Sequence, residues 1–103
     1  MEKIVNIIES IAHEKGLNIE DVKEALKTAL IRTAKKIYGQ EYEYEVEIDE
    51  KNKELKLFQK VLVVADDDPR KDEDKEKYIS LSEAKEIDPE IEVGDELTYE
   101  LPL

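Results

Sequence analysis

The sequence predicts an α+β fold in which an antiparallel helical hairpin is joined to a small sheet built on a β-hairpin. Three observations predict it. From residue 2 to residue 38 the apolar side chains recur at spacings of three and four, which is typical of helices. After Gly39 the spacing changes to two, which is typical of strands with one buried face. A capping box and a second alternating stretch then predict a short helix and a last strand.

The first predicted helix spans residues 2–15. Its apolar arc is wider than the stripe that a surface helix buries on one neighbour, and it holds Ile4, Val5, Ile7, Ile8, Ile11 and Ala12. Gly16 is expected to end this helix. The connection of Leu17 and Asn18 is so short that the next helix must turn back antiparallel to the first.

The second predicted helix, residues 19–38, is the longest element. Its predicted buried face holds Val22, Ala25, Leu26, Ala29, Leu30, Thr33, Ala34 and Ile37. Asn18 is the expected N-cap, and Gly39 is expected to end the helix in the left-handed conformation. Ile31 and Tyr38 lie on the opposite line of the helix, so they are expected to face away from the packing side.

Two strands are predicted next, at residues 42–48 and 55–65, with the polar stretch 49–54 as their turn. Residues 61–65 are apolar without alternation, which predicts a strand end buried on both faces. Residues 66–77 are nearly all charged and predict a solvated, irregular loop. A short strand at residues 78–79, a helix from the capping box of Ser80 and Glu83 to about Glu86, and a strand over residues 97–101 complete the fold.

Length and charge limit the classes of protein that fit. At 103 residues the chain is expected to form one domain, residues 1–103, and to be a monomer. It has no cysteine, no apolar run long enough for a membrane span and no signal peptide, so a cytoplasmic location is expected. The net charge is −12, and it is uneven: residues 1–40 hold 7 Lys and Arg against 6 Asp and Glu, whereas residues 41–103 hold 9 against 22.

No residue pattern predicts catalysis or a cofactor. The carboxylates of Glu43, Glu45 and Glu47 fall on the polar face of the first strand, which predicts a solvated surface rather than a catalytic site. His13 is the only histidine, and without cysteines or a second histidine no metal site can be assembled around it. The chain is therefore not expected to be an enzyme, and no catalytic, cofactor or metal residues are predicted.

One basic cluster is predicted on this acidic protein. Arg32, Lys35 and Lys36 fall within an arc of about 100° beside the predicted buried face of the second helix. Cations in a last helical turn also complement the helix dipole, which is an ordinary structural role. Both interpretations stay open at this point: a structural role and a binding surface.

Two motifs carry a resemblance to a known family. Residues 25–39 read A-L-x-x-A-L-I-R-T-A-K-K-I-Y-G, and residues 78–97 read Y-I-S-L-S-E-A-K-E-I-D-P-E-I-E-V-G-D-E-L. Together with the Tyr/Glu strand between them, they resemble the N-terminal domain of the bacterial transcription elongation and termination factor NusA over essentially the whole chain. The resemblance implies a helical body with a small β-containing head. In the family, S1 and KH domains that bind RNA follow directly, and they are expected to be absent from a chain of residues 1–103.

The resemblance also implies a function. Domains of this family dock their factor on RNA polymerase at the flap tip of the β subunit, near the RNA exit channel, and modulate pausing, termination and antitermination. The T-A-K-K-I-Y-G motif implies that Lys35 and Lys36 contact the nascent RNA hairpin, and the helical arc adds Arg32. Surplus apolar residues of the helical body are expected to contact polymerase: Ile4, Ile8, Ile11 and Ile31.

An alternative function follows from charge alone. The acidic part of the chain, residues 41–103, could act as an electrostatic partner or nucleic-acid mimic that binds a basic protein. Such binding would collapse with added salt, whereas an apolar docking interface would weaken little.

Overall fold

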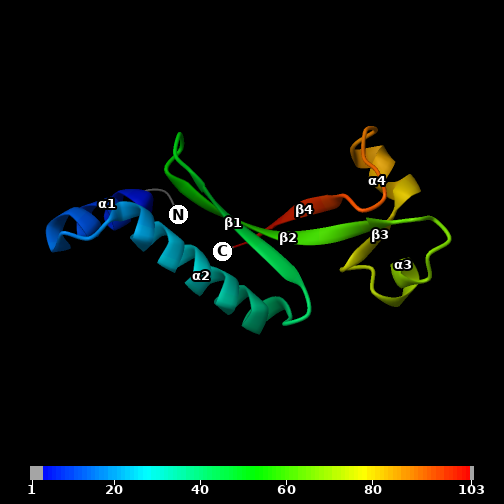
Figure 1. Ribbon diagram of the computed structural model, residues 1–103, viewed down its shortest axis with the longest axis horizontal. Helices are drawn as coiled ribbons and strands as arrows, with labels where there is room; N and C mark the ends of the chain where they lie inside the picture. Colours follow the sequence, from blue (N-terminus) through cyan, green and yellow to red (C-terminus); the bar gives the residue numbers. More distant parts are fainter. Residues whose placement is uncertain (1–3, 103) are drawn as a thin grey trace. The chain divides into compact units, whose positions relative to one another are not determined.

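The computed structural model describes residues 4–102, apart from the side chain of Ile4 (Figure 1). The elements in chain order are α1 (Ile4–Lys15), α2 (Ile19–Tyr38), β1 (Glu43–Asp49), β2 (Glu54–Val64), α3 (Arg70–Glu73), β3 (Tyr78–Ser80), α4 (Leu81–Ile87) and β4 (Glu96–Leu101). The α+β class is thus confirmed. The chain divides into two compact units: the first comprises Met1–Phe58 with Glu100–Leu103, and the second comprises Gln59–Tyr99. That residues 1–103 work as one domain stays a prediction.

Helix α1 buries only part of its apolar arc. Val5, Ile8 and Ala12 are buried, with relative exposures of 0%, 7% and 2%. Gly16 ends the helix as predicted: its φ is +67°, and the N–H of the next residue donates to the carbonyl of Ala12. The predicted start at residue 2 lies outside the described residues.

Helix α2 has the predicted bounds and the predicted N-cap. The Asn18 side-chain oxygen accepts hydrogen bonds from the backbone N–H groups of Glu20 (2.9 Å) and Asp21 (3.3 Å). The predicted left-handed cap at Gly39 is wrong, because its φ and ψ are 141° and 139°. A Cβ at Gly39 would lie 2.8 Å from the ring of Tyr42, so this positive-φ position suits a residue without a side chain.

The face that α2 buries is also corrected. Ile31 and Tyr38, predicted to face outward, pack with Leu26 and Leu30 around Ala34 and against the buried side chains of the hairpin, which are Tyr44, Val46, Leu55 and Leu57. In the first unit α2 lies along β1 (Figure 1). Ile31 is therefore part of this packing rather than a residue on an outlying face.

Four residues of α2 that were predicted to be buried lie on the surface instead. Ala25, Ala29, Thr33 and Ile37 are exposed, and Ile37 retains 68% of its accessible surface. Leu26, Leu30 and Ala34 fit both orientations of the helix. Tertiary packing decides between them, because the hairpin side chains contact the face of α2 that holds Ile31 and Tyr38.

The β-hairpin and the end of β2 agree with the sequence prediction. Tyr44 and Val46 of β1 are buried, and β1 lies next to β2 in the sheet. Consecutive Val63 and Val64 are each 1% exposed, so the end of β2 is buried on both faces. Strand β4 also pairs with β2.

The second unit has its own core of Val63, Ala84 and Ile91. Strand β3 pairs in parallel with the end of β2, with Leu62 opposite Tyr78. Helix α4 begins at the predicted cap, since the Ser80 hydroxyl accepts a hydrogen bond from the N–H of Glu83.

The charged stretch 66–77 is more regular than predicted, because it contains helix α3. The Arg70 guanidinium forms a 2.8 Å ion pair with Asp68 and lies 5.0 Å from the centre of the Tyr78 ring. Asp66 accepts hydrogen bonds from both the backbone N–H and the hydroxyl of Ser82 at the start of α4. Contacts with Tyr78 and Ser82, which periodicity does not reveal, help to hold this stretch.

Candidate functional site

The predicted basic cluster forms an exposed face near the end of α2. Arg32 and Lys36 are exposed and Lys35 is half-buried. None of the three forms a salt bridge with any residue in the described range 4–102, whereas Lys23 and Lys27 of the same helix do. We call Arg32, Lys35 and Lys36 the basic face. No carboxylate of residues 4–102 is ion-paired with these cations, so the basic face is available to an anion.

Small side chains border the basic face. Ala29 lies about 60° from Arg32 around the helix axis, and Ala25 and Thr33 are exposed on the same side. The sequence pattern assigned these residues to the core and so missed this border. Their size was the available signal, because they offer less area to bury than Ile31 and Tyr38 do.

A second exposed feature lies on α1. Ile7 and Ile11 are 52% and 42% exposed and lie one helical turn apart, beside the buried face of the same helix. We call this pair the apolar shoulder. Single exposed isoleucines are ordinary, but a pair at i, i+4 on one helix presents the spacing that a partner helix or groove contacts.

The residues predicted to contact polymerase are not equivalent in the structure. Ile11 is on the apolar shoulder, Ile8 is 7% exposed, and Ile31 packs against the core of the first unit. The side chain of Ile4 lies outside the described residues. Ile7 is an exposed apolar residue that the prediction did not include among the contacts.

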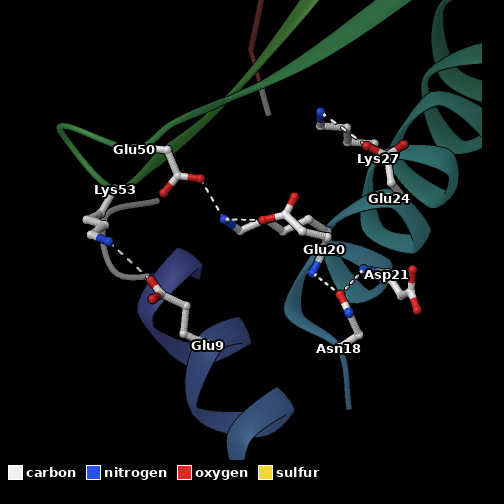
Figure 2. A network of polar contacts seen from close by, with 9 residues as sticks. Glu9, Asn18, Glu20, Asp21, Glu24, Lys27, Glu50 and Lys53 are labelled. Carbon is white, nitrogen blue, oxygen red and sulfur yellow. Dashed lines mark hydrogen bonds and ion pairs between the residues drawn. The ribbon is translucent and has the colours of Figure 1, made fainter.

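A polar network joins the start of α2 to the β1–β2 turn (Figure 2). The Lys23 ammonium donates a 2.6 Å hydrogen bond to Glu50 and lies 3.7 Å from Glu20, and its side chain is only 12% exposed. The hydrogen bond with Glu50 raises the pKa of Lys23, and the same bond lowers the pKa of Glu50. Both groups are therefore held in their charged forms.

The same turn also contacts α1. The Lys53 ammonium lies 3.2 Å from a carboxylate oxygen of Glu9, and Figure 2 shows the two side chains pointing toward each other from the turn and the helix. The β1–β2 turn thus has one ion pair to each helix of the helical hairpin.

Three aspartates of the described residues are held in their charged forms. Hydrogen bonds from Asn52, Ser82 and Arg70 lower the pKa values of Asp49, Asp66 and Asp68. A general acid at neutral pH needs a raised pKa. Within residues 4–102 no three His, Cys, Asp or Glu side chains are grouped as metal ligands, and His13 is exposed. Among the described helices, none is long and apolar enough to cross a membrane.

These features define a class of protein: a small α+β domain whose distinctive groups lie on exposed helical surfaces, as in domains that bind other macromolecules. A sequence model of the NusA N-terminal domain matches residues 3–102. The chain belongs to the NusA N-terminal domain family.

Individual relatives agree with this assignment. The chain is 45% identical over 103 residues to the transcription termination/antitermination protein NusA of Helicobacter pylori strain J99, covering 100% of this chain and 26% of that protein. It is 32% identical over 107 residues to NusA of Thermus thermophilus, covering 94% of this chain and 26% of that protein. The chain thus spans about a quarter of the length of these relatives.

A solved structure shows the same fold. The solution structure of the N-terminal domain of NusA from Bacillus subtilis matches with a TM-score of 0.74 and 27% identity, over 98% of this chain and 77% of that one.

Proposed function

We propose that this chain is a non-catalytic RNA polymerase-binding module of a transcription elongation, termination and antitermination factor. It acts in the cytoplasm as a monomer, with residues 1–103 as one domain. It docks on the flap tip of the β subunit near the RNA exit channel and modulates pausing and termination. The family assignment supports the role in transcription, and the exposed apolar shoulder is the observation that supports docking.

The apolar shoulder suits a helical partner such as a flap tip. Ile7 and Ile11 are already about half covered, so completing their burial would contribute about 1–2 kcal/mol each. Val5, Ile8 and Ala12 hold the adjoining face of α1 against the domain, so the shoulder belongs to a helix that is already folded. A partner therefore avoids the entropic cost of ordering a flexible segment.

We assign the nascent RNA hairpin to the basic face. Its three cations, which form no ion pair with the part of the chain that the structure describes, can contact backbone phosphates, and the small residues beside them leave room for a nucleic acid. The net charge of −12 opposes RNA binding by the free chain. The contact is therefore expected only when docking on polymerase places the basic face beside the emerging RNA.

The docking proposal is tested with a fluorescently labelled chain titrated with core RNA polymerase. Replacing Ile7 and Ile11 together by serine should weaken binding on the order of tenfold or more, because two apolar contacts are lost. The control is Ile37→Ser, which changes an exposed isoleucine on α2. Melting curves should show all three proteins folded. Equal affinity of the double variant and the unmodified chain would refute docking through the shoulder.

The competing electrostatic role is tested in the same assay. The second unit, Gln59–Tyr99, carries 6 Lys and Arg against 14 Asp and Glu, which is the observation that favours a basic partner. A polymerase affinity that changes little with salt supports apolar docking. A steep loss of affinity with salt, together with insensitivity to the shoulder variant, would instead favour the acidic surface.

A further inference from the structure

Lys53 adopts a backbone conformation that lysine does not favour. Its φ is +57°, and it is the sole non-glycine residue with positive φ among those described. Glycine or asparagine is the usual choice there, because a Cβ makes the left-handed conformation unfavourable. The rest of the turn follows common turn chemistry, since Asp49 accepts hydrogen bonds from the N–H groups of Lys51 and Asn52. The backbone alone therefore does not account for a lysine at this position.

The Lys53 side chain supplies a reason. Its ammonium forms the ion pair with Glu9, 44 residues earlier in the chain, at 3.2 Å. A glycine or asparagine would leave Glu9 without this cation. The second ion pair of the turn, Lys23 to Glu50, fixes the turn to α2, so Lys53 presents its charge to α1 from an anchored position.

Glu9 occupies an informative position on α1. At 100° per residue it lies about 40° from Val5, at one edge of the buried face, and about 160° from both Ile7 and Ile11. The buried face thus separates the ion pair on one edge from the apolar shoulder on the other. A helix that is held at one edge of its buried face is restrained from rolling about its own axis.

We propose that Lys53 is a positioning residue: its ion pair with Glu9 fixes the rotation of α1 and so keeps Ile7 and Ile11 facing outward. A lysine at this positive φ is unfavourable for the backbone, and the restraint on α1 explains why a lysine is nevertheless present. The restraint on α1 stands on the ion pair and the turn geometry alone. Its consequence for docking rests on the proposed function.

Hydrogen exchange of the α1 backbone amides tests the restraint directly. In Lys53→Glu and in Glu9→Lys, amides from Ile8 to Ala12 should exchange about two- to fivefold faster, the range expected for an exposed ion pair. The swapped double variant, Glu9→Lys with Lys53→Glu, should return exchange toward the original rate. The matched control is Lys51→Glu, because Lys51 lies in the same turn and forms no ion pair with any described residue. Failure of the swap to restore protection would overturn the proposal.

Lys53→Gly separates the backbone from the side chain. This variant relieves the unfavourable φ and removes the ammonium, so α1 should exchange faster while the melting temperature stays nearly unchanged. Unchanged exchange in α1 would show that the ammonium restrains nothing.

A polymerase titration of the same variants separates this proposal from the docking proposal. If the unmodified chain binds polymerase, the variants whose α1 amides exchange faster should also bind polymerase more weakly. Affinities that do not correlate with the exchange rates of α1 would refute the effect of Lys53 on docking. If the unmodified chain does not bind, the docking proposal fails, and the exchange data still decide the restraint.

Discussion

The hydroxyl of Tyr38, the last residue of α2, donates a 3.0 Å hydrogen bond to the carbonyl of Pro102, 64 residues later. The Tyr38 ring also packs in the core of the first unit, 6.5 Å from the ring of Tyr44. One side chain therefore joins the end of α2 both to the hairpin and to the chain after β4. This contact would not exist if α2 had buried the face that its sequence period predicts.

Two variants of Tyr38 separate these contributions. Tyr38→Phe keeps the ring, so it should lower the free energy of unfolding by about 1 kcal/mol or less, the usual range for one exposed hydrogen bond. Tyr38→Ala also removes the packed ring and should cost clearly more, on the order of 2–4 kcal/mol for a half-buried aromatic residue. Urea denaturation followed by circular dichroism measures both. If Tyr38→Ala were as stable as the unmodified protein, the Tyr38 side chain would face outward, as the sequence period predicts, and not into the core.

Core truncations test the corrected packing more broadly. Leu57 is 4% exposed, so Leu57→Ala should lower the free energy of unfolding by about 2–5 kcal/mol. Ile37→Ala should change it by no more than about 0.5 kcal/mol, because Ile37 is 68% exposed. Leu30→Ala should fall between them, since Leu30 is half-buried. A larger loss for Ile37 than for Leu57 in denaturant titrations would contradict this packing.

Local signals in the sequence were sufficient for most of the elements. The bounds of α2 follow from Asn18 and from the apolar period, and the change of period at Gly39 marks the start of the hairpin. Rotation of a helix is a different question, because the face it buries depends on what its neighbours can cover. In α2 two overlapping apolar faces share Leu26, Leu30 and Ala34, and tertiary packing buries the one that also holds Ile31 and Tyr38.

The candidate site, too, could be predicted only in part, because part of it depends on which faces the helices bury. The basic face comes from adjacent residues of one helix, so Arg32, Lys35 and Lys36 could be grouped from spacing alone. The shoulder needs knowledge of which isoleucines α1 buries, and the sequence did not distinguish Ile7 from Ile8. The Lys53 ion pair joins residues 44 positions apart and leaves no local pattern.

The pH dependence of stability follows from the bound carboxylates. Hydrogen bonds in the folded state lower the pKa values of Asp49 and Asp66 below the ordinary 3.8, and of Glu50 below the ordinary 4.5. The unfolded chain therefore binds protons first as the pH falls. The stability from these groups is fully present above the ordinary pKa values and is lost as the pH falls through the lower, folded values.

Melting temperatures measured from neutral pH down to about pH 3 should thus decline below about pH 4.5. Protonating carboxylates also changes the repulsion among the other charges of the protein, and moderate salt in the buffer screens this repulsion. Asp66→Asn removes one such carboxylate, so its melting temperature should depend less on pH over this range. An identical pH profile for the variant would show that the contacts of Asp66 with Ser82 do not contribute.

The RNA contact is tested in the full-length factor. Replacing Lys35 and Lys36 together by alanine should leave the domain folded and shorten hairpin-stabilised pauses, because the two cations proposed to contact RNA phosphates are lost. Lys27→Ala is the matched control, since Lys27 lies on the same helix but is already paired with Glu24 at 3.6 Å. Pause lifetimes in single-round transcription provide the readout. Equal lifetimes for the double variant and the control would contradict the assignment of RNA to the basic face.

Docking through α1 is tested most directly by an NMR titration of the isotope-labelled chain with a peptide that spans the flap-tip helix of the β subunit. We expect the largest shift changes on the side chains of Ile7 and Ile11 and on their neighbours in α1, with small changes in Gln59–Tyr99. A titration that shifts the acidic second unit and leaves α1 unchanged, or one that shifts neither, would contradict docking through α1.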